Sequence, residues 1–167
     1  MIQVYTGNGK GKTTSAWGLA LRAAGAGLRV YIGQFIKGNN YSELEILKKI
    51  PRLTIEQYGK GCFIKHKPKQ RDIDLACKGL ERARKIIAKK NYDLIILDEI
   101  NVALHFGLLK VNEVLNLLKS IPEDIELVLT GRWAHSEIIK LADLVSEIKD
   151  IKHYYKKGIK ARKGIEF

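Results

Sequence analysis

TGNGKGKTT, at residues 6–14, follows a short apolar run at 2–5 and leads into a helical pattern from Ser15. A strand, a glycine-rich loop and a helix in this order form a phosphate-binding loop, because glycines let several backbone N–H groups turn toward one anion. The N-terminus of the helix adds the positive end of a dipole. We therefore predict nucleotide binding by the loop residues Gly7, Asn8, Gly9, Lys10, Gly11, Lys12, Thr13 and Thr14.

Two side chains of this loop have specific chemical tasks. Lys12 can reach a β- or γ-phosphate, and the Thr13 hydroxyl can bind Mg²⁺. The spelling departs from the common GxxxxGK[ST] pattern, because Thr6 stands where the first glycine is expected and Gly7 follows one position late. A plain glycine-rich turn is the alternative, but it does not account for the adjacent lysine and threonine.

A second motif supplies carboxylates. Four apolar residues at 94–97 are followed by Asp98 and Glu99, which is the Walker B pattern of a buried strand that ends beside a phosphate loop. The alternative is an ordinary strand with acidic turn residues after it. Together with the loop, the motif predicts a metal site made by Thr13, Asp98 and Glu99.

Two basic residues stand just beyond other apolar runs. Lys37 follows the predicted strand at 30–35, and Arg132 follows the one at 125–130. The carboxyl ends of parallel strands face the ligand crevice of an open α/β sheet, so Arg132 is expected to pair with phosphate. Lys37 is either an anion contact or a solvated lysine.

Arg22 and Phe63 each have two possible roles, one in the structure and one in ligand binding. Arg22 stands ten residues past Lys12, near the end of the first helix, where an arginine usually serves the helix C-terminus. Phe63 lies in an irregular, lysine-rich stretch at 59–70 that we expect to be an exposed loop. It either packs on a flat ligand or anchors the loop in the core.

Strand and helix patterns alternate along the whole chain, which predicts an α/β fold with a mostly parallel sheet and helices on both faces. The long interval between loop and carboxylates favours a three-layer α/β/α P-loop NTPase fold of the RecA-like type, in a single domain over residues 1–167. The predicted strands are 2–5, 30–35, 53–57, 94–97, 125–130 and 144–148, and the predicted helices are 15–25, 42–49, 71–90, 111–119 and 136–142.

The bulk properties are those of a soluble globular protein. Of 167 residues, 46% are hydrophobic and 29% charged, and no apolar run approaches the ~20 residues that a membrane span needs. The chain enters its first strand at once, so we expect no signal peptide and a cytoplasmic location. Cys62 and Cys77 are expected to be free thiols.

The formal net charge is +12, from 30 Lys and Arg against 18 Asp and Glu. Such a field attracts nucleic acid, an anionic substrate or an acidic protein, and it also occurs on lysine-rich surfaces of heat-adapted proteins. The charge alone does not choose among these.

Several segments together resemble one family, the ATP:corrinoid adenosyltransferases. The loop spelling with Thr6 and Gly7 is this family's own, and the glycine-rich ending of the chain is similar to the family's ending. The matching stretches run in order through the chain: TGNGKGKTT (6–14), QFIKG (34–38), ILDEIN (96–101), LTGR (129–132), LADLVSEI (141–148), KH (152–153) and KGIKARKGIEF (157–167).

The resemblance implies a reaction. The Co(I) of a reduced corrinoid attacks the 5′ carbon of ATP and releases triphosphate, in the biosynthesis or salvage of adenosylcobalamin (coenzyme B12). It also implies Mg²⁺ (or Mn²⁺), a homodimer, and an acidic electron donor such as reduced flavodoxin. In this reading Lys12 and Arg132 are catalytic, Arg22 joins the ATP site, and Lys37 and Phe63 contact the corrinoid.

One departure from the family concerns the corrinoid face. The family's loop often carries a phenylalanine and a tryptophan that exclude the lower axial ligand of the cobalt. Phe63 matches the first, but no tryptophan stands between 59 and 66, where only Cys62 and Ile64 offer similar apolar bulk.

Two other activities suit the same loop and carboxylates. A RecA-like ATPase stimulated by nucleic acid would keep Glu99 as a water-activating carboxylate, and a small kinase would hold a phosphoryl acceptor in the crevice. The sequence has no recognised nucleic-acid module and no interleaving of aromatic and basic residues. We therefore expect no nucleic-acid partner, and no membrane.

Overall fold

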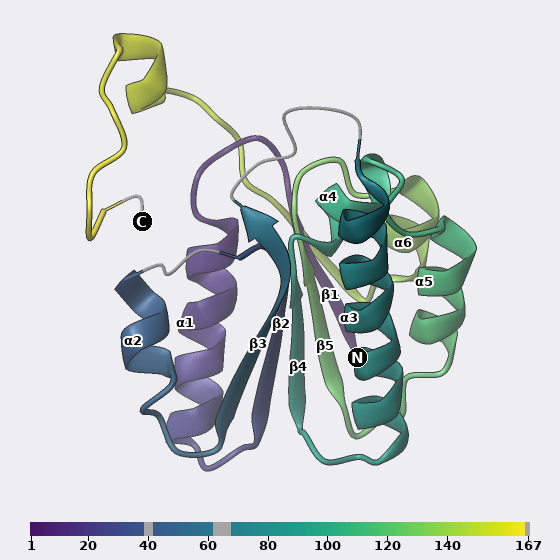
Figure 1. Ribbon diagram of the computed structural model, residues 1–167. Helices are drawn as coiled ribbons and strands as arrows, with labels where there is room; N and C mark the ends of the chain where they lie inside the picture. Colours follow the sequence, from purple (N-terminus) through teal and green to yellow (C-terminus); the bar gives the residue numbers. More distant parts are fainter. Residues whose placement is uncertain (39–41, 62–67, 166–167) are drawn as a thin grey trace.

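The computed structural model describes residues 1–38, 42–61 and 68–165 (Figure 1). In this part of the chain six parallel strands form one sheet, in the order β3-β2-β4-β5-β1-β6. The sheet is thus wholly parallel, where the sequence predicted a mostly parallel one. The strands are β1 (Ile2–Thr6), β2 (Val30–Lys37), β3 (Leu53–Gly61), β4 (Leu94–Asp98), β5 (Glu126–Thr130) and β6 (Leu144–Glu147).

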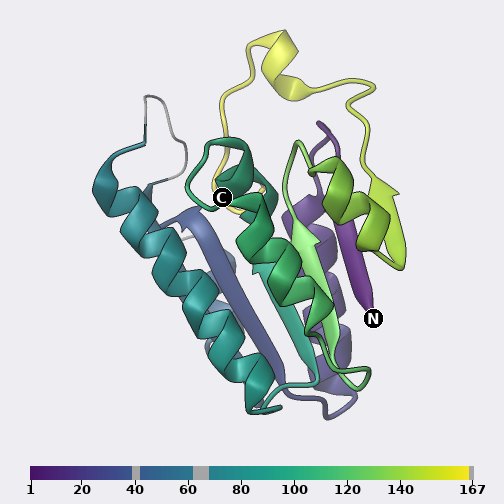
Figure 2. The same cartoon turned by 90° about the vertical axis from the view of Figure 1, so that its right-hand side faces the viewer.

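Helices cover both faces of the sheet, which confirms the predicted three-layer α/β/α architecture (Figures 1 and 2). One face carries α1 (Lys12–Gly25) and α2 (Ser42–Leu47). The other face carries α3 (Gln70–Ala88), α4 (Ile100–His105), α5 (Val111–Lys119) and α6 (Ser136–Leu141). None of the helices in the described residues has the length and apolar character needed to cross a membrane.

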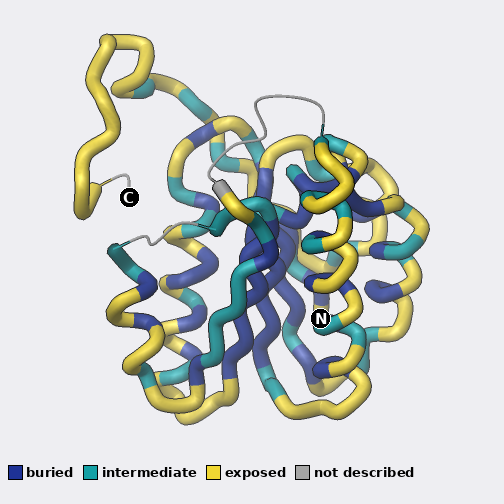
Figure 3. The backbone as a smooth tube through the Cα atoms, in the orientation of Figure 1, coloured by how far each residue is buried: buried dark blue, intermediate teal, exposed yellow. Residues whose placement is uncertain are grey.

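Successive side chains along each strand point to opposite faces of the sheet, so each strand contributes to both halves of the core. On β2, Val30 and Ile32 pack against α1, whereas Tyr31 and Phe35 pack on the side of α3. All four side chains are fully buried, and the central strands form the dark-blue interior of Figure 3. A strand that is buried on both faces needs the continuous apolar runs that the sequence shows.

The strand order brings the candidate residues to one edge. In the sheet β5 lies between β1, which leads into the glycine loop, and β4, which ends at Asp98. Gln34 of β2 pairs in register with Asp98 of β4. Because all strands are parallel, the loop, the carboxylates and the ends of β2 and β5 share the carboxyl edge.

Three elements differ most from the sequence prediction. β3 runs to Gly61 rather than ending at residue 57, so residues 59–61 belong to a strand and not to the predicted loop. The first helix begins at Lys12 rather than Ser15, so that Lys12 and Thr13 form its first turn. The short helix α4 starts directly after Glu99 and was not predicted, because six residues give too little periodicity to read. Beyond β6 the chain projects from the body of the fold through a 3₁₀ turn at Tyr154–Lys157 and returns to Lys10 at Ile165, and most of its described residues are exposed (Figure 1).

Candidate active site

The glycine loop is packed against the end of β6. Gly7 and Gly11 have φ angles of 96° and 121°, which L side chains rarely adopt. The Gly9 N–H donates to the Ile148 carbonyl at 2.7 Å. A Cβ on Gly9 would lie 2.7 Å from the Lys149 carbonyl oxygen, and one on Gly7 would collide with the backbone of Ile148. These glycines therefore fit where no other residue does.

Lys12 is buried inside this loop. Its Nζ donates to the Gly7 carbonyl at 2.7 Å and to the Gly9 carbonyl at 2.6 Å. Burial lowers the pKa of Lys12, against the opposing effect of Glu99. The loop thus encloses the ammonium of Lys12, which two of its own backbone oxygens stabilise. A phosphate-binding loop holds its anion at this same place.

Asp98 is fully buried and accepts hydrogen bonds from four side chains. Thr13 and Thr130 donate to Oδ1 at 3.0 and 2.6 Å. Lys37 and Gln34 donate to Oδ2 at 3.1 and 3.2 Å. Burial by itself would raise the pKa of Asp98, but the charge of Lys37 and these hydrogen bonds outweigh it and hold the pKa below its usual range. Asp98 is therefore an ionised carboxylate in the interior.

Glu99 is the less buried member of the pair. Its backbone lies in the left-handed region, with φ of 61°, and its N–H donates to Thr130 Oγ1 at 3.0 Å. Burial raises the pKa of Glu99, and the neighbouring Asp98 raises it further. A non-glycine residue held at positive φ next to a buried carboxylate is typical of functional sites.

The oxygen atoms of Thr13, Asp98 and Glu99 suit a hard divalent cation. Lys37 Nζ lies 3.0 Å from Thr13 Oγ1, 3.1 Å from Asp98 Oδ2 and 3.7 Å from Glu99 Oε1, so these three already surround one positive charge. Within the described residues no cluster of three or more His, Cys, Asp and Glu side chains could hold a metal by itself. The oxygen donors of Thr13, Asp98 and Glu99 fit Mg²⁺, which is usually held by one or two carboxylates together with substrate phosphates.

The structure places the two candidate arginines differently. Arg132 follows β5 and is exposed, and its charge acts on both Lys12 and Glu99. Arg22 lies in the last turn of α1, ten residues past Lys12. At a rise of about 1.5 Å per residue, that is about 15 Å along the helix axis. The fold brings Arg132 to the loop and leaves Arg22 away from it.

The two candidate corrinoid residues also have different outcomes. Lys37 was predicted as an anion or corrinoid contact, and the structure instead directs it into the carboxylate pair. Phe63 lies outside the described residues, as do Cys62 and Ile64.

Sequence reasoning missed several residues of this edge. Gln34 and Thr130 orient Asp98, and both could have been found as polar residues at the ends of apolar strands. A cluster of rings lies beside Arg132: Trp133 stacks on His105 at 4.2 Å between ring centroids, and Phe106 meets Trp133 edge-on at 6.0 Å. No spacing signal joins Trp133 to His105, because β5 and α4 bring them together only in the fold.

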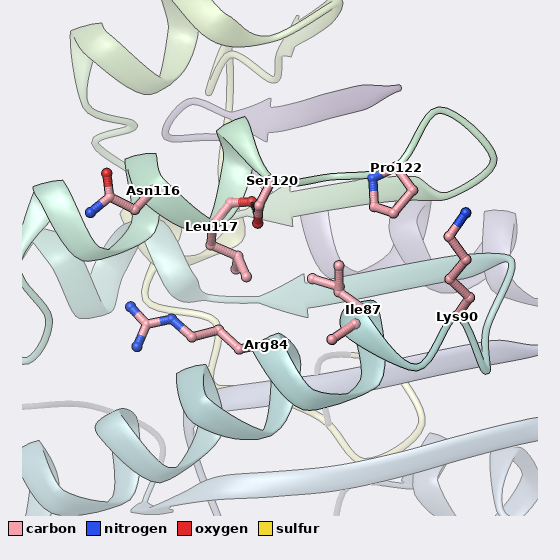
Figure 4. Close-up of a pocket in the computed structure, with 8 residues that line it drawn as sticks. Arg84, Ile87, Lys90, Asn116, Leu117, Ser120 and Pro122 are labelled. Atoms are coloured by element: carbon pink, nitrogen blue, oxygen red, sulfur yellow. Dashed lines mark hydrogen bonds between the residues drawn. The ribbon is translucent and has the colours of Figure 1, made fainter.

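A hollow of about 500 Å³ lies between α3 and α5, away from the candidate active-site residues (Figure 4). Arg84 and Ile87 line one side, and Asn116 and Leu117 line the other. Lys90 and Pro122, which also line it, precede β4 and β5, so the hollow belongs to the amino edge of the sheet. The candidate active site lies at the opposite edge.

Residues 1–167 match the family model described as ATP:corrinoid adenosyltransferase BtuR/CobO/CobP. A corrinoid adenosyltransferase of Pseudomonas aeruginosa is 38% identical over 100% of this chain and 83% of that protein. One of Escherichia coli strain K12 is 34% identical over 100% of this chain and 85% of that protein. A corrinoid adenosyltransferase of Salmonella typhimurium, CobA, is 33% identical over the same shares.

A solved structure resembles the fold. The KaiC-like protein PH0186 from the hyperthermophilic archaeon Pyrococcus horikoshii superposes with a TM-score of 0.58, over 89% of this chain and 71% of that chain, at 18% sequence identity. At this identity the likeness concerns the fold alone, and it confirms the predicted RecA-like P-loop architecture.

Proposed function

The chain belongs to the ATP:corrinoid adenosyltransferase family BtuR/CobO/CobP, and from this membership we propose how its residues catalyse the adenosylation of a corrinoid in cobalamin biosynthesis. One adenosyltransferase domain would span residues 1–167, the range that the family model matches. The observation that carries the assignment of the site is the hydrogen bond of 3.0 Å from Thr13 to Asp98. It joins the phosphate loop to the carboxylate pair at one point.

The reaction asks for electrostatics rather than for a protein nucleophile. Cobalt(I) of the reduced corrinoid gives its electron pair to the 5′ carbon of ATP, the Co–C bond forms, and the C–O bond to the α-phosphate breaks. Triphosphate leaves with that bonding pair, so negative charge grows on the α-phosphate oxygen. The protein has to stabilise that charge and to align the two substrates.

The loop and the start of α1 would hold the triphosphate. The proposed ATP contacts are the residues Gly7 to Thr14, whose N–H groups and helix N-terminus favour anions. The Gly9 N–H is already bonded to Ile148, so the remaining amides would carry this role. Lys12, held by two loop carbonyls, would turn its ammonium to the phosphate oxygens.

Mg²⁺ is the proposed cofactor, with Mn²⁺ as its substitute, and Thr13, Asp98 and Glu99 would hold it. When bound, the ion would neutralise charge on the triphosphate. The chemistry of the three oxygen donors and the ammonium that they already surround support this assignment. Gln34 and Thr130 would orient Asp98 by their hydrogen bonds.

Arg132 is the proposed second catalytic cation. It is exposed after β5, close enough to act on Lys12 and Glu99, and its planar guanidinium can bind two phosphate oxygens at once. Arg22 has no geometric support within one chain, since it lies at the other end of α1. Phe63 remains a predicted corrinoid contact outside the described residues.

Two partners are proposed at the level of the whole molecule: a second copy of the chain, and an acidic electron donor such as reduced flavodoxin. The donor proposal is supported by the net charge of +12, because opposite charges favour fast, salt-sensitive docking. Sedimentation equilibrium tests the homodimer, and a single species at the monomer mass would contradict it.

The adenosyl transfer is tested with a chemically reduced corrinoid, ATP and Mg²⁺. We expect the absorption spectrum of a light-sensitive Co–C bond to develop, and to revert on illumination. The Thr13→Val variant keeps the shape of the side chain but removes its oxygen, and should lose most of this conversion. An unchanged rate in this variant would refute the proposed role of the loop.

A further inference from the structure

The ammonium of Lys37 stands where the proposed metal ligands converge. Its Nζ lies 3.0 Å from Thr13 Oγ1, 3.1 Å from Asp98 Oδ2 and 3.7 Å from Glu99 Oε1. Mg²⁺ binds its oxygen ligands at about 2.0–2.1 Å. An ion bound to these oxygens and the ammonium of Lys37 would overlap, so the two cations exclude each other.

The backbone before Lys37 has an unusual conformation that directs the side chain. Ile36 has φ of 68°, in the left-handed region that a β-branched residue rarely enters. The register between β2 and β3 shifts between Ile36 and Lys37, which marks a β-bulge. The neighbouring strand offers Gly59 at this point, where a Cβ would collide with the Ile36 backbone. The extra residue of this bulge, Lys60, lies on β3, and the left-handed backbone at Ile36 turns β2 just before Lys37.

The charge of Lys37 has a clear structural task when no other cation is near. Asp98 is fully buried, and an ionised carboxylate in the interior is costly unless it is paired. Lys37 has only 16% of its side-chain surface exposed and is in ion-pair contact with both Asp98 and Glu99. The fold therefore contains its own counter-ion for the carboxylate pair.

We infer that Lys37 is a resident counter-cation that a divalent metal has to displace, so that the metal binds together with ATP and not ahead of it. This inference rests on the proposed metal site of Thr13, Asp98 and Glu99. A metal that arrives alone would drive the ammonium from its carboxylates with no new anion to receive it. When a triphosphate lies at the loop beside Thr13, its oxygens can accept the displaced ammonium. ATP and metal then raise each other's affinity.

The test measures binding of Mn²⁺, whose sharp electron paramagnetic resonance signal is lost when the ion is bound. The Lys37→Met variant keeps most of the aliphatic stem and removes the charge. Lys119→Met is the matched control, because Lys119 is an exposed lysine at the end of α5. Titrations are made without ATP and with ATP, with protein in excess over ATP and with no corrinoid present.

Without ATP, we expect Lys37→Met to bind Mn²⁺ at least ~10-fold more tightly than the native protein and the Lys119→Met control. A tenfold change in Kd corresponds to about 1.4 kcal/mol of binding free energy. The native protein should take up Mn²⁺ mainly when ATP is added, and this gain should be smaller in Lys37→Met. If Lys37→Met folds poorly, Lys37→Gln takes its place, because its amide can still donate to Asp98. It should also bind Mn²⁺ more tightly than the native protein without ATP.

Three results would overturn the inference. In the first, native protein binds Mn²⁺ with ATP, but neither Lys37 variant binds it more tightly than native without ATP; the metal site then stands and the role of Lys37 fails. In the second, native protein binds Mn²⁺ equally well with and without ATP, which needs no variant to observe. If native protein takes up no Mn²⁺ even with ATP, the proposed metal site itself is wrong and the inference falls with it.

Discussion

Lys12 shows how one residue can be unfavourable for folding and useful for binding. It is buried, its pKa is lowered by that burial, and its ammonium donates hydrogen bonds to the carbonyls of Gly7 and Gly9. Burial disfavours the charged form of this lysine, and a nearby phosphate would favour it again. The lysine should therefore interact strongly with an anion. The side chain is therefore expected to matter more for ATP than for stability.

The Lys12→Met variant separates these two effects. We expect kcat for adenosyl transfer to fall by about 10²–10³-fold, the usual loss when one charge-stabilising group is removed from an active site. Thermal unfolding should occur at a temperature no lower than that of the native protein, because a desolvated charge has been removed. A variant that keeps its activity, or one that loses it only by unfolding, would argue against the assigned role.

The sequence singled out the candidate residues more readily than it predicted their contacts. Lys12, Thr13, Asp98 and Glu99 could be found because each belongs to a motif of fixed spacing on one strand or loop. Lys37 could not be placed, because it follows a left-handed residue, Ile36, at a register shift between β2 and β3 that leaves no mark in the pattern of apolar residues. Contacts that depend on the positions of two separate strands need the fold itself.

The glycine loop and the end of β6 form one structural element, although about 140 residues separate them in the chain. The N–H of Gly9 is bonded to Ile148, and the close approach leaves no room for a Cβ. The proposed binding of a triphosphate and the docking of β6 therefore involve the same backbone, and a change in one should disturb the other.

Substitution of Gly9 by alanine tests this coupling. We expect Gly9→Ala to lower the free energy of unfolding by about 1–3 kcal/mol, as overpacking does, and to weaken ATP binding at the same time. Gly18→Ala is the matched control, since a Cβ on Gly18 in α1 meets nothing within 4 Å. It should raise stability by about 0.5–1 kcal/mol and leave ATP affinity unchanged. Equal effects of the two changes would contradict the packing argument.

Strands β2 and β4 are joined at their amino ends by one ion pair. Arg29 Nη2 lies 2.6 Å from Asp93 Oδ1, and the Arg29 N–H donates to Asp93 Oδ2 at 2.7 Å. The side-chain hydrogen bond from Arg29, followed by this backbone bond, lowers the pKa of Asp93 to about 2. The pair lies directly before the point where the two strands start in register, with Val30 opposite Leu94.

The pKa of Asp93 predicts a pH dependence of stability. The folded value of about 2 lies below the ordinary value of 3.8, so the pair stabilises the fold above about pH 4 and this contribution is lost as the pH falls toward 2. Asp93→Asn should lower the urea midpoint at pH 7, and the gap to the native midpoint should close between pH 4 and pH 2. A gap that stays constant over this range would show that the ion pair is not its cause.

The order of elements was predicted more fully than their boundaries. The long helix α3 shows a regular apolar face, and the buried strands β2, β4 and β5 have continuous apolar runs, so each was recognised. The helix α4 was missed because it has six residues, and because it is fixed by Ile100 and Leu104 packing on the sheet rather than by its own periodicity. Short elements are set by tertiary contacts, which sequence patterns do not contain.

At the scale of the whole molecule, the excess of positive charge and the exposed chain beyond β6 are the features that the active site does not explain. Residues 149–165 are almost entirely exposed, and Lys10 of the glycine loop donates to the carbonyl of Ile165 at 2.9 Å. The segment that matches the family's ending therefore touches the phosphate loop. This contact links the basic ending of the chain to the proposed ATP site.

The proposed acidic electron donor gives a prediction at this scale. Raising the salt concentration from about 0.05 to about 0.5 M should slow turnover that depends on a flavodoxin-like donor, because the Debye length falls and attraction between opposite charges is screened. Turnover with a small chemical reductant should change little over the same range. If both rates respond equally to salt, the docking of an acidic donor on a basic surface is refuted.

The most direct test of the whole account is the identity of the phosphate product. Protein, ATP, Mg²⁺ and a chemically reduced corrinoid are incubated in the dark, and the products are followed by phosphorus NMR together with the corrinoid spectrum. The account predicts free triphosphate and adenosylated corrinoid in equal amounts, with neither formed when the corrinoid is left out. Formation of ADP and free phosphate in place of triphosphate, whether or not corrinoid is present, would contradict it.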